Sequence, residues 1–112
     1  MADGRDVVSE TYEVIRGIVK ELDQNKDSYT ADDVAALEDY VGTSLVWVKK
    51  CRGKVWLRSK EGTDLANVSL AAANLLKESL GDPSAAKDAA RDLFFQTETL
   101  GKKVASKAAI VT

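Results

Sequence analysis

Residues 81–104 read GDPSAAKDAARDLFFQTETLGKKV and carry the clearest structural signal of this chain. The opening Gly81-Asp82-Pro83 predicts a helix boundary. Gly81 suits a left-handed position after one helix, Asp82 suits the cap of the next, and Pro83 suits its first turn. Small and apolar residues then alternate in steps of four and three, the spacing of a bundle seam, with Phe94 widening the stripe. The seam residues are Ala86, Ala90, Leu93, Thr97, Leu100 and Val104. We therefore expect a long helix over residues 83–108.

Two helices are indicated near the N-terminus. Apolar residues recur at three- and four-residue steps over residues 6–23, and the polar stretch 24–28 breaks that pattern. Thr30 then resembles an N-cap, with Asp33 in the first turn, where the helix dipole favours an acid. The second helix is expected to end at Gly53. Its apolar face is made of Val34, Leu37, Val41, Leu45 and Val48.

A further helix precedes residue 81. It is expected to begin between Val55 and Thr63 and to end at Leu80, with Gly62 either a kink or the true start. Its predicted apolar stripe consists of Leu65, Val68, Ala72, Leu75, Leu76 and Leu80. Alanines at 71–73 and at 86, 89 and 90 indicate that this helix and the last one approach closely.

Four amphipathic helices with short connections predict an all-α, antiparallel up-down-up-down four-helix bundle. The whole chain, residues 1–112, is expected to form this single domain, with more than about 60% helix. The leucines expected in its core are Leu37, Leu65, Leu75, Leu93 and Leu100.

Composition indicates little chemistry. The chain has no histidine, which removes the commonest metal ligand and general base, and one cysteine, Cys51, which cannot form an internal disulfide. Cys51 is interpreted as a small buried apolar side chain or, alternatively, as a reactive thiol whose pKa is lowered by Lys50 and Arg52. Residues 23–27 resemble a calcium loop only faintly. We predict no enzymatic activity, no cofactor and no bound metal.

Charge is distributed unevenly. Residues 1–40 hold four cations and eleven acids, whereas residues 41–112 hold twelve cations and seven acids. The cationic segment, residues 47–60, contains six cations, both tryptophans and no acid. It is interpreted as a solvated helix end, as a docking patch for an acidic protein surface, or as a nucleic-acid or anionic-lipid site. The net charge of −2 disfavours the last of these.

The docking interpretation assigns seven residues of the cationic segment to the partner surface. They are Lys49, Lys50, Arg52, Lys54, Trp56, Arg58 and Lys60. We expect their side chains to gather at one end of the bundle, with the acidic first helix facing away from the partner. If this segment is not the docking site, Lys102, Lys103 and Lys107 are the next candidates.

The second half of the chain resembles a known family. Trp56 is followed by Asp64-Leu65 opening a long helix that closes with Leu75-Leu76 and Leu80, then by a proline-containing turn and the run AARDLFFQTETLGKKVASK at 89–107. Over residues 47–107 this arrangement is similar to the last two helices of the PsbQ-like extrinsic subunits of photosystem II. The compact size, without a proline-rich N-terminal arm, resembles the short forms of diatoms and related algae.

The resemblance implies a non-enzymatic four-helix protein on the lumenal face of photosystem II. Such a subunit docks onto acidic lumenal subunits and helps the oxygen-evolving complex to retain calcium and chloride, without binding those ions itself. It implies a monomer before docking, peripheral to the thylakoid membrane, in the chloroplast thylakoid lumen, with no nucleic-acid partner. It also implies a mature chain whose targeting segment has been removed; the alternative is a cytoplasmic protein.

Rival functions stay open. One is a cytoskeletal or signalling adaptor bundle that opens to bind an amphipathic partner helix, and a second is a small nucleic-acid-associated helical protein. The adaptor alternative predicts weak salt dependence of binding. The extrinsic-subunit alternative predicts attachment that salt washes away, because salt screens exposed charges.

Overall fold

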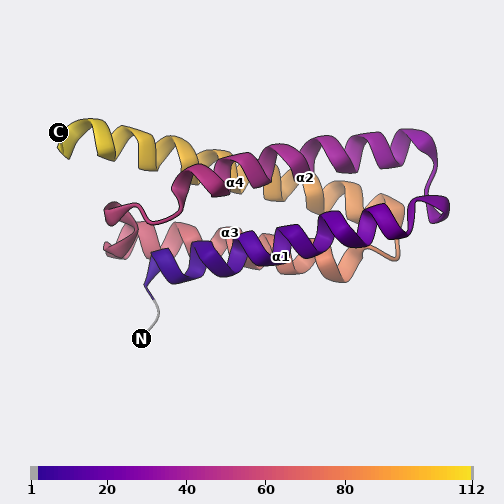
Figure 1. Cartoon of the computed structure of the whole chain (residues 1–112), viewed down its shortest axis with the longest axis horizontal. Helices are drawn as coiled ribbons and strands as arrows, with labels where there is room; N and C mark the ends of the chain where they lie inside the picture. The colour runs from indigo at the N-terminus through magenta and orange to yellow at the C-terminus, as the bar shows by residue number, and fades with distance from the viewer. Residues whose placement is uncertain (1–2, 112) are drawn as a thin grey trace.

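The computed structural model describes residues 3–111, and the side chains of residues 3–107. Helix makes up 90% of the described residues, which contain no strand. The all-α prediction, with helix content above about 60%, is therefore confirmed. The elements in chain order are α1 (Gly4–Gln24), the 3-10 turn η1 (Lys26–Ser28), α2 (Ala31–Cys51), the 3-10 turn η2 (Val55–Arg58), α3 (Lys60–Ser79) and α4 (Pro83–Val111) (Figure 1).

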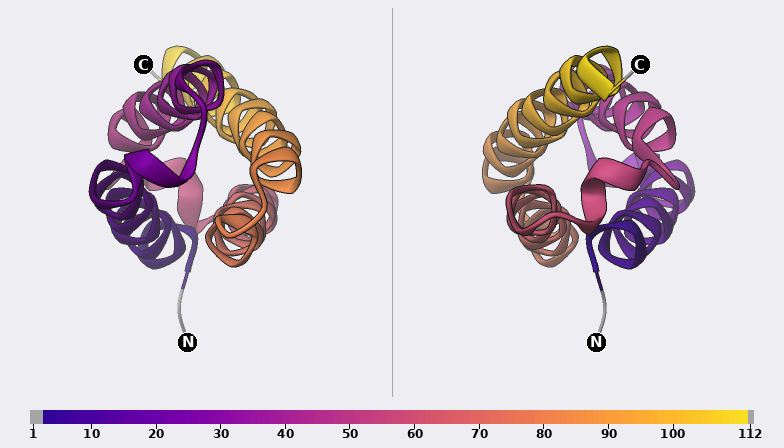
Figure 2. Two further views of the ribbon diagram at one scale, coloured as in Figure 1. Left: turned by 90° about the vertical axis from the view of Figure 1, so that its right-hand side faces the viewer. Right: turned by 90° about the vertical axis from the view of Figure 1, so that its left-hand side faces the viewer.

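The four helices alternate in direction along a bundle 47 Å long (Figure 1). Their order around the bundle does not follow their order in the chain. α1 packs against α2 and α3, and α4 packs against the same two helices. The consecutive helices α2 and α3 therefore occupy opposite corners, and the chain between them crosses one end of the bundle (Figure 2).

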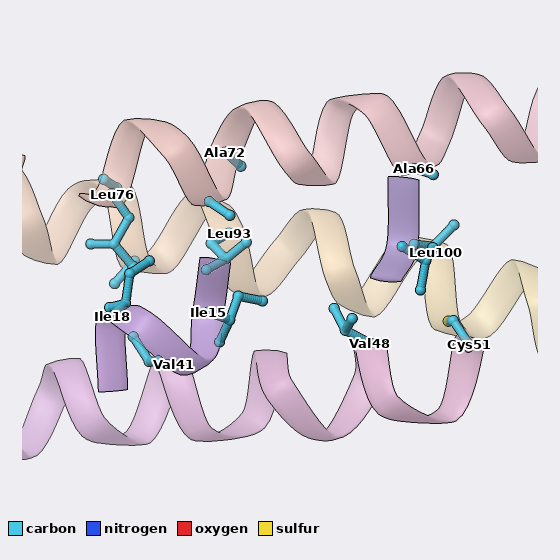
Figure 3. Close-up of a cluster of buried hydrophobic side chains, with 14 of the residues drawn as sticks. Ile15, Ile18, Val41, Val48, Cys51, Ala66, Ala72, Leu76, Leu93 and Leu100 are labelled. Carbon is cyan, nitrogen blue, oxygen red and sulfur yellow. The ribbon is translucent and has the colours of Figure 1, made fainter. Parts of the chain in front are cut away.

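The core lies along the bundle axis, where side chains of all four helices point toward one another (Figure 3). Ile15 and Ile18 of α1, Leu37 of α2 and Leu76 of α3 are fully buried. The seam predicted for α4 is confirmed, because each of its residues is buried. Those residues are Ala86, Ala90, Leu93, Thr97, Leu100 and Val104.

The predicted core face of α3 was wrong in part. Leu75 is 52% exposed, Val68 is 46% exposed and Leu65 is only half-buried. The buried face instead carries mostly small side chains, namely Gly62, Ala66, Ser69, Ala72, Ala73 and Leu76. Ala72, Leu76 and Leu80 of the expected stripe are buried, so the buried face is turned only part of the way from the one expected. The small residues let α3 lie close to both of its neighbours, α1 and α4.

The predicted caps are mostly present. The Asp82 Oδ1 atom accepts hydrogen bonds from the N–H groups of Ser84 and Ala85, at 3.1 and 3.3 Å. Thr30 Oγ1 accepts one from the Asp33 N–H at 3.1 Å. The left-handed conformation expected at Gly81 was wrong, because Gly81 does not have a positive φ. Within the described residues only Gly53, with φ 74°, has a positive φ, and it turns the chain out of α2 as expected.

Candidate functional site

The end cap, residues 52–59, joins α2 to α3 by crossing the end of the bundle (Figure 2, right). It contains η2, whose Leu57 side chain is fully buried and packs into the end of the core. Trp56 beside it is half-buried and packs against the same core. The end cap is thus part of the hydrophobic core as well as a connection between helices.

Two glycines let the end cap pack directly on the first turns of α1 and α3. A Cβ atom at Gly62 would lie 2.6 Å from the carbonyl oxygen of Trp56 and 2.8 Å from the Cα of Leu57. One at Gly4 would overlap the carbonyl group of Leu57. Both positions therefore require glycine for close backbone approach. Gly62 lies in the first turn of α3 and is not a kink.

Two hydroxyl groups hold the end cap in place. Thr63 Oγ1 donates to the carbonyl oxygen of Leu57 at 3.0 Å and accepts from the N–H of Gly4 at 3.1 Å. Ser59 Oγ donates to the carbonyl oxygen of Trp56 at 2.7 Å and accepts from the Gly62 N–H at 3.0 Å, which caps α3. Hydrogen bonds and close packing together join α1, η2 and α3 into one rigid end.

The six cations of the cationic segment are all exposed at this end. Lys49 and Lys50 lie in the last turn of α2, and Lys60 opens α3. Only Lys60 has a carboxylate partner, Asp64, at 2.7 Å, and this ion pair raises the pKa of Lys60. The other five cations make no ion pair with any described residue. They are Lys49, Lys50, Arg52, Lys54 and Arg58.

Two of these unpaired cations lie over aromatic rings. The Arg52 guanidinium is 4.4 Å from the centroid of the Tyr12 ring, and the Lys50 ammonium is 5.2 Å from the Trp47 ring. A cation–π contact restrains the side chain but leaves the positive charge uncompensated. Tyr12 belongs to α1 and was not among the predicted site residues, because its contact with Arg52 is tertiary.

The C-terminal turns of α4 reach the same end of the bundle (Figure 1). Lys103 pairs with Glu61 of α3 at 3.3 Å, and Lys102 pairs with Glu98 one turn back at 3.4 Å. These are two of the three second-choice docking candidates, and they are thus partly neutralised within the molecule; the third, Lys107, pairs with no described carboxylate. The cationic segment keeps the larger share of uncompensated charge.

The expectation that the first helix faces away from this end was wrong for its first turn. Asp3, in an ion pair with Arg5 at 3.1 Å, caps α1 next to the end cap, and the guanidinium of Arg5 lowers the pKa of Asp3. The reason is that α1 begins at the end where α2 finishes. The C-terminal turns of α1, η1 and the start of α2 form the opposite, acidic end (Figure 1).

Cys51 belongs to the cationic segment but is fully buried, in the last turn of α2. Burial raises the pKa of its thiol to about 11, although the nearby charge of Lys54 acts in the opposite direction. A buried, neutral thiol is a poor nucleophile. The interpretation of Cys51 as a reactive thiol was therefore wrong, and that of a buried apolar side chain is confirmed.

No group of three or more potential metal ligands was found among the described residues, those at 23–27 included. None of the described helices combines the length and apolar character needed to cross a membrane. Comparisons with protein-family models, with curated proteins and with solved structures returned no match.

Proposed function

We propose that this protein is an extrinsic subunit that docks onto an acidic protein surface through its cationic end, which is the end of the bundle that carries the cationic segment. The single observation that carries the proposal is a set of five exposed cations, on the last turn of α2 and on the end cap, that pair with no described carboxylate. One face of the molecule therefore presents positive charge that an external carboxylate surface would complement.

This charge is better suited to guiding the approach of the protein to its partner than to providing affinity by single contacts. An exposed ion pair contributes little on its own, roughly 0–1 kcal/mol, so affinity must come from several contacts made together. The acidic opposite end of the bundle makes the molecule a dipole, which orients it during encounter with an acidic surface. Because Thr63 and Ser59 fix the backbone of the end cap, binding has to order only the side chains of its cations and not the segment that carries them.

The resemblance over residues 47–107 leads us to place this surface on the lumenal side of photosystem II. There the bundle covers and stabilises neighbouring subunits of the oxygen-evolving complex and so helps to retain calcium and chloride. In this proposal the protein lies in the thylakoid lumen, has no catalytic activity and binds no metal. The four-helix architecture supports this proposal but is shared by many unrelated functions.

The proposal is tested by rebinding the purified protein to salt-washed photosystem II membranes. A variant with Lys49, Lys50, Lys54 and Arg58 changed to Gln removes charge from the cationic end. A control with Lys26, Lys77, Lys87 and Arg91 changed to Gln removes the same charge from elsewhere. We expect the first variant to rebind much more weakly at low salt, the control to rebind like the parent, and salt to release the parent.

Equal rebinding by the parent and by the variant that removes four cations of the cationic segment would overturn docking through this surface. Circular dichroism of both variants checks that the helices are intact. Failure of the parent to bind the membranes at any salt concentration would overturn the photosystem assignment. The adaptor alternative stays a prediction; salt-insensitive binding of an amphipathic helix that opens the bundle would favour it.

A further inference from the structure

A groove of about 540 Å³ runs between α1 and α2, away from the end cap. Its floor is apolar and is made by Val19 and Leu22 of α1 and by Val41, Gly42 and Leu45 of α2. Val19 is 41% exposed and Leu45 is half-buried, so water reaches apolar surface here. This volume lies in the range of about 300–1,000 Å³ typical of ligand pockets.

The groove exists because α1 and α2 are the most loosely packed of the four neighbouring helix pairs. Gly42 contributes to this looseness, because a Cβ atom built there would meet no atom within 4 Å. No backbone turn requires this glycine, since it lies within α2 and has no positive φ. Gly42 costs helix stability and leaves the groove deeper than alanine or leucine would.

The two ends of the groove differ in charge. At one end Lys26 bridges Asp23 of α1 and Glu38 of α2, at 3.1 and 3.7 Å, so these carboxylates are already partnered. Toward the other end the α1 rim carries Arg16 and Lys20, neither of which pairs with a described carboxylate.

The Arg16 guanidinium also lies 5.7 Å from the centroid of the Tyr12 ring, which the Arg52 guanidinium covers as well. Two guanidinium groups thus converge on one tyrosine where α1 meets the end of α2. The apolar floor and the unpaired cations Arg16 and Lys20 line the same groove, and a ligand that fits it must be apolar along its length and anionic at one end.

We propose that this groove binds an amphipathic α-helix of another protein, with apolar side chains on the groove floor and carboxylates against Arg16 and Lys20. The backbone dipole of the bound helix fixes its direction, because a helix C-terminus is favoured next to cations. The partner helix therefore runs parallel to α2, with its carboxyl end toward Arg52. The bundle stays closed, and the proposal does not rest on docking through the end cap.

The length of the groove defines the recognition pattern. Residues 16–23 of α1 and 38–45 of α2 line it, which corresponds to about 10 Å or two helical turns. A helix of this length presents three or four anchors, at positions i, i+3, i+4 and i+7. The expected partner sequence thus has a short apolar stripe followed within one turn by Glu or Asp.

The test uses a lactam-bridged helical peptide of about three turns, with Leu at i, i+3, i+4 and i+7, Lys in the first turn and Glu in the last. A second peptide has the same composition with the Lys and Glu turns exchanged. Binding to the full chain is followed by fluorescence anisotropy and by amide NMR shifts. We expect the first peptide to bind about tenfold more tightly than the second, and its shifts to map to the α1–α2 groove.

Gly42→Leu fills the groove, and Gly17→Leu is its matched control, because a Cβ at Gly17 also meets no atom within 4 Å and lies outside the groove. We expect Gly42→Leu to weaken binding about tenfold or more and Gly17→Leu to leave it unchanged. Equal binding by the two variants, or shifts confined to the end cap, would overturn the proposal. Self-association of the peptide-free protein that Gly42→Leu abolishes would overturn it in favour of a second copy of this chain.

Discussion

The indole ring of Trp47 in α2 lies directly over Gly101 in α4. A Cβ atom at Gly101 would come within 3.0 Å of Cζ3 and 3.1 Å of Cδ2 of that ring, and closer still to Cε3. Gly101 is therefore the site at which α4 makes room for the tryptophan, and the Lys50 ammonium lies over the same ring. This contact anchors the last turns of α2, from which the unpaired cations Lys49 and Lys50 project.

Gly101→Ala is expected to displace this indole. Alanine favours the helix, but the added methyl group overpacks the contact. Gly17→Ala adds the same methyl group where no atom lies within 4 Å, and it should stabilise the protein by about 0.5–1 kcal/mol. We expect Gly101→Ala to be about 1–3 kcal/mol less stable than Gly17→Ala in urea unfolding. Unchanged tryptophan fluorescence in Gly101→Ala would contradict the close contact.

Two leucines that look alike in the sequence should respond differently to truncation. Leu93 is fully buried, and Leu93→Ala is expected to cost about 2–5 kcal/mol of unfolding free energy because it leaves a cavity. Leu75 is 52% exposed, and Leu75→Ala should change stability by no more than about 0.5 kcal/mol. Chemical denaturation of both variants measures the difference. Similar losses would mean that α3 buries the face that its leucines suggest.

Thr63 is expected to stabilise the end cap through its hydroxyl group. Thr63→Val keeps the shape of the side chain but leaves the Gly4 N–H and the Leu57 carbonyl without this partner, at an expected cost of about 1–3 kcal/mol. Thr99→Val is the control, because the Thr99 hydroxyl bonds only to the Phe95 carbonyl on an exposed helix face. Hydrogen exchange at residues 55–63 should accelerate in Thr63→Val alone. Equal protection in both variants would rule out this role.

The raised pKa of the Cys51 thiol predicts that the protein loses stability at alkaline pH. Its thiol has a pKa of about 11 in the folded protein and an ordinary value of 9.0. Between these values the unfolded chain releases the proton and the folded chain keeps it, so unfolding becomes easier as pH rises from 9 toward 11. The free energy of unfolding of the parent minus that of Cys51→Ala should fall over this range. A difference that stays constant with pH would show that the thiol ionises freely in the folded state.

The last helix could be predicted from sequence because its signals are local. The Asp82 side chain caps the N–H groups two and three residues ahead, and the four-and-three spacing from Ala86 to Val104 specifies one helix face. The face of α3 could not be predicted in the same way. Its buried stripe of Gly62, Ala66 and Ser69 is small rather than hydrophobic, and its value lies in the close approach of two neighbouring helices.

The candidate site was predicted in composition but not in geometry. The cations between 49 and 60 are visible in the sequence, and the structure places them at one end of the bundle as expected. Their surroundings depend on tertiary contacts: Tyr12 meets Arg52 from a distant helix, and Gly4 meets the Leu57 carbonyl. A glycine that is needed for close approach looks the same in sequence as one that permits a kink.

The diagonal placement of α2 and α3 has a consequence for folding. The hairpin of α1 and α2 and the hairpin of α3 and α4 each leave one apolar side uncovered, since α1 needs α3 and α2 needs α4. Neither hairpin is a complete folding unit, and the first turn of α1 gains its partners only when Leu57 and Thr63 are in place. We therefore expect the chain to fold and unfold as one cooperative unit, and the two halves left by cleavage within the end cap to be unstable when separated.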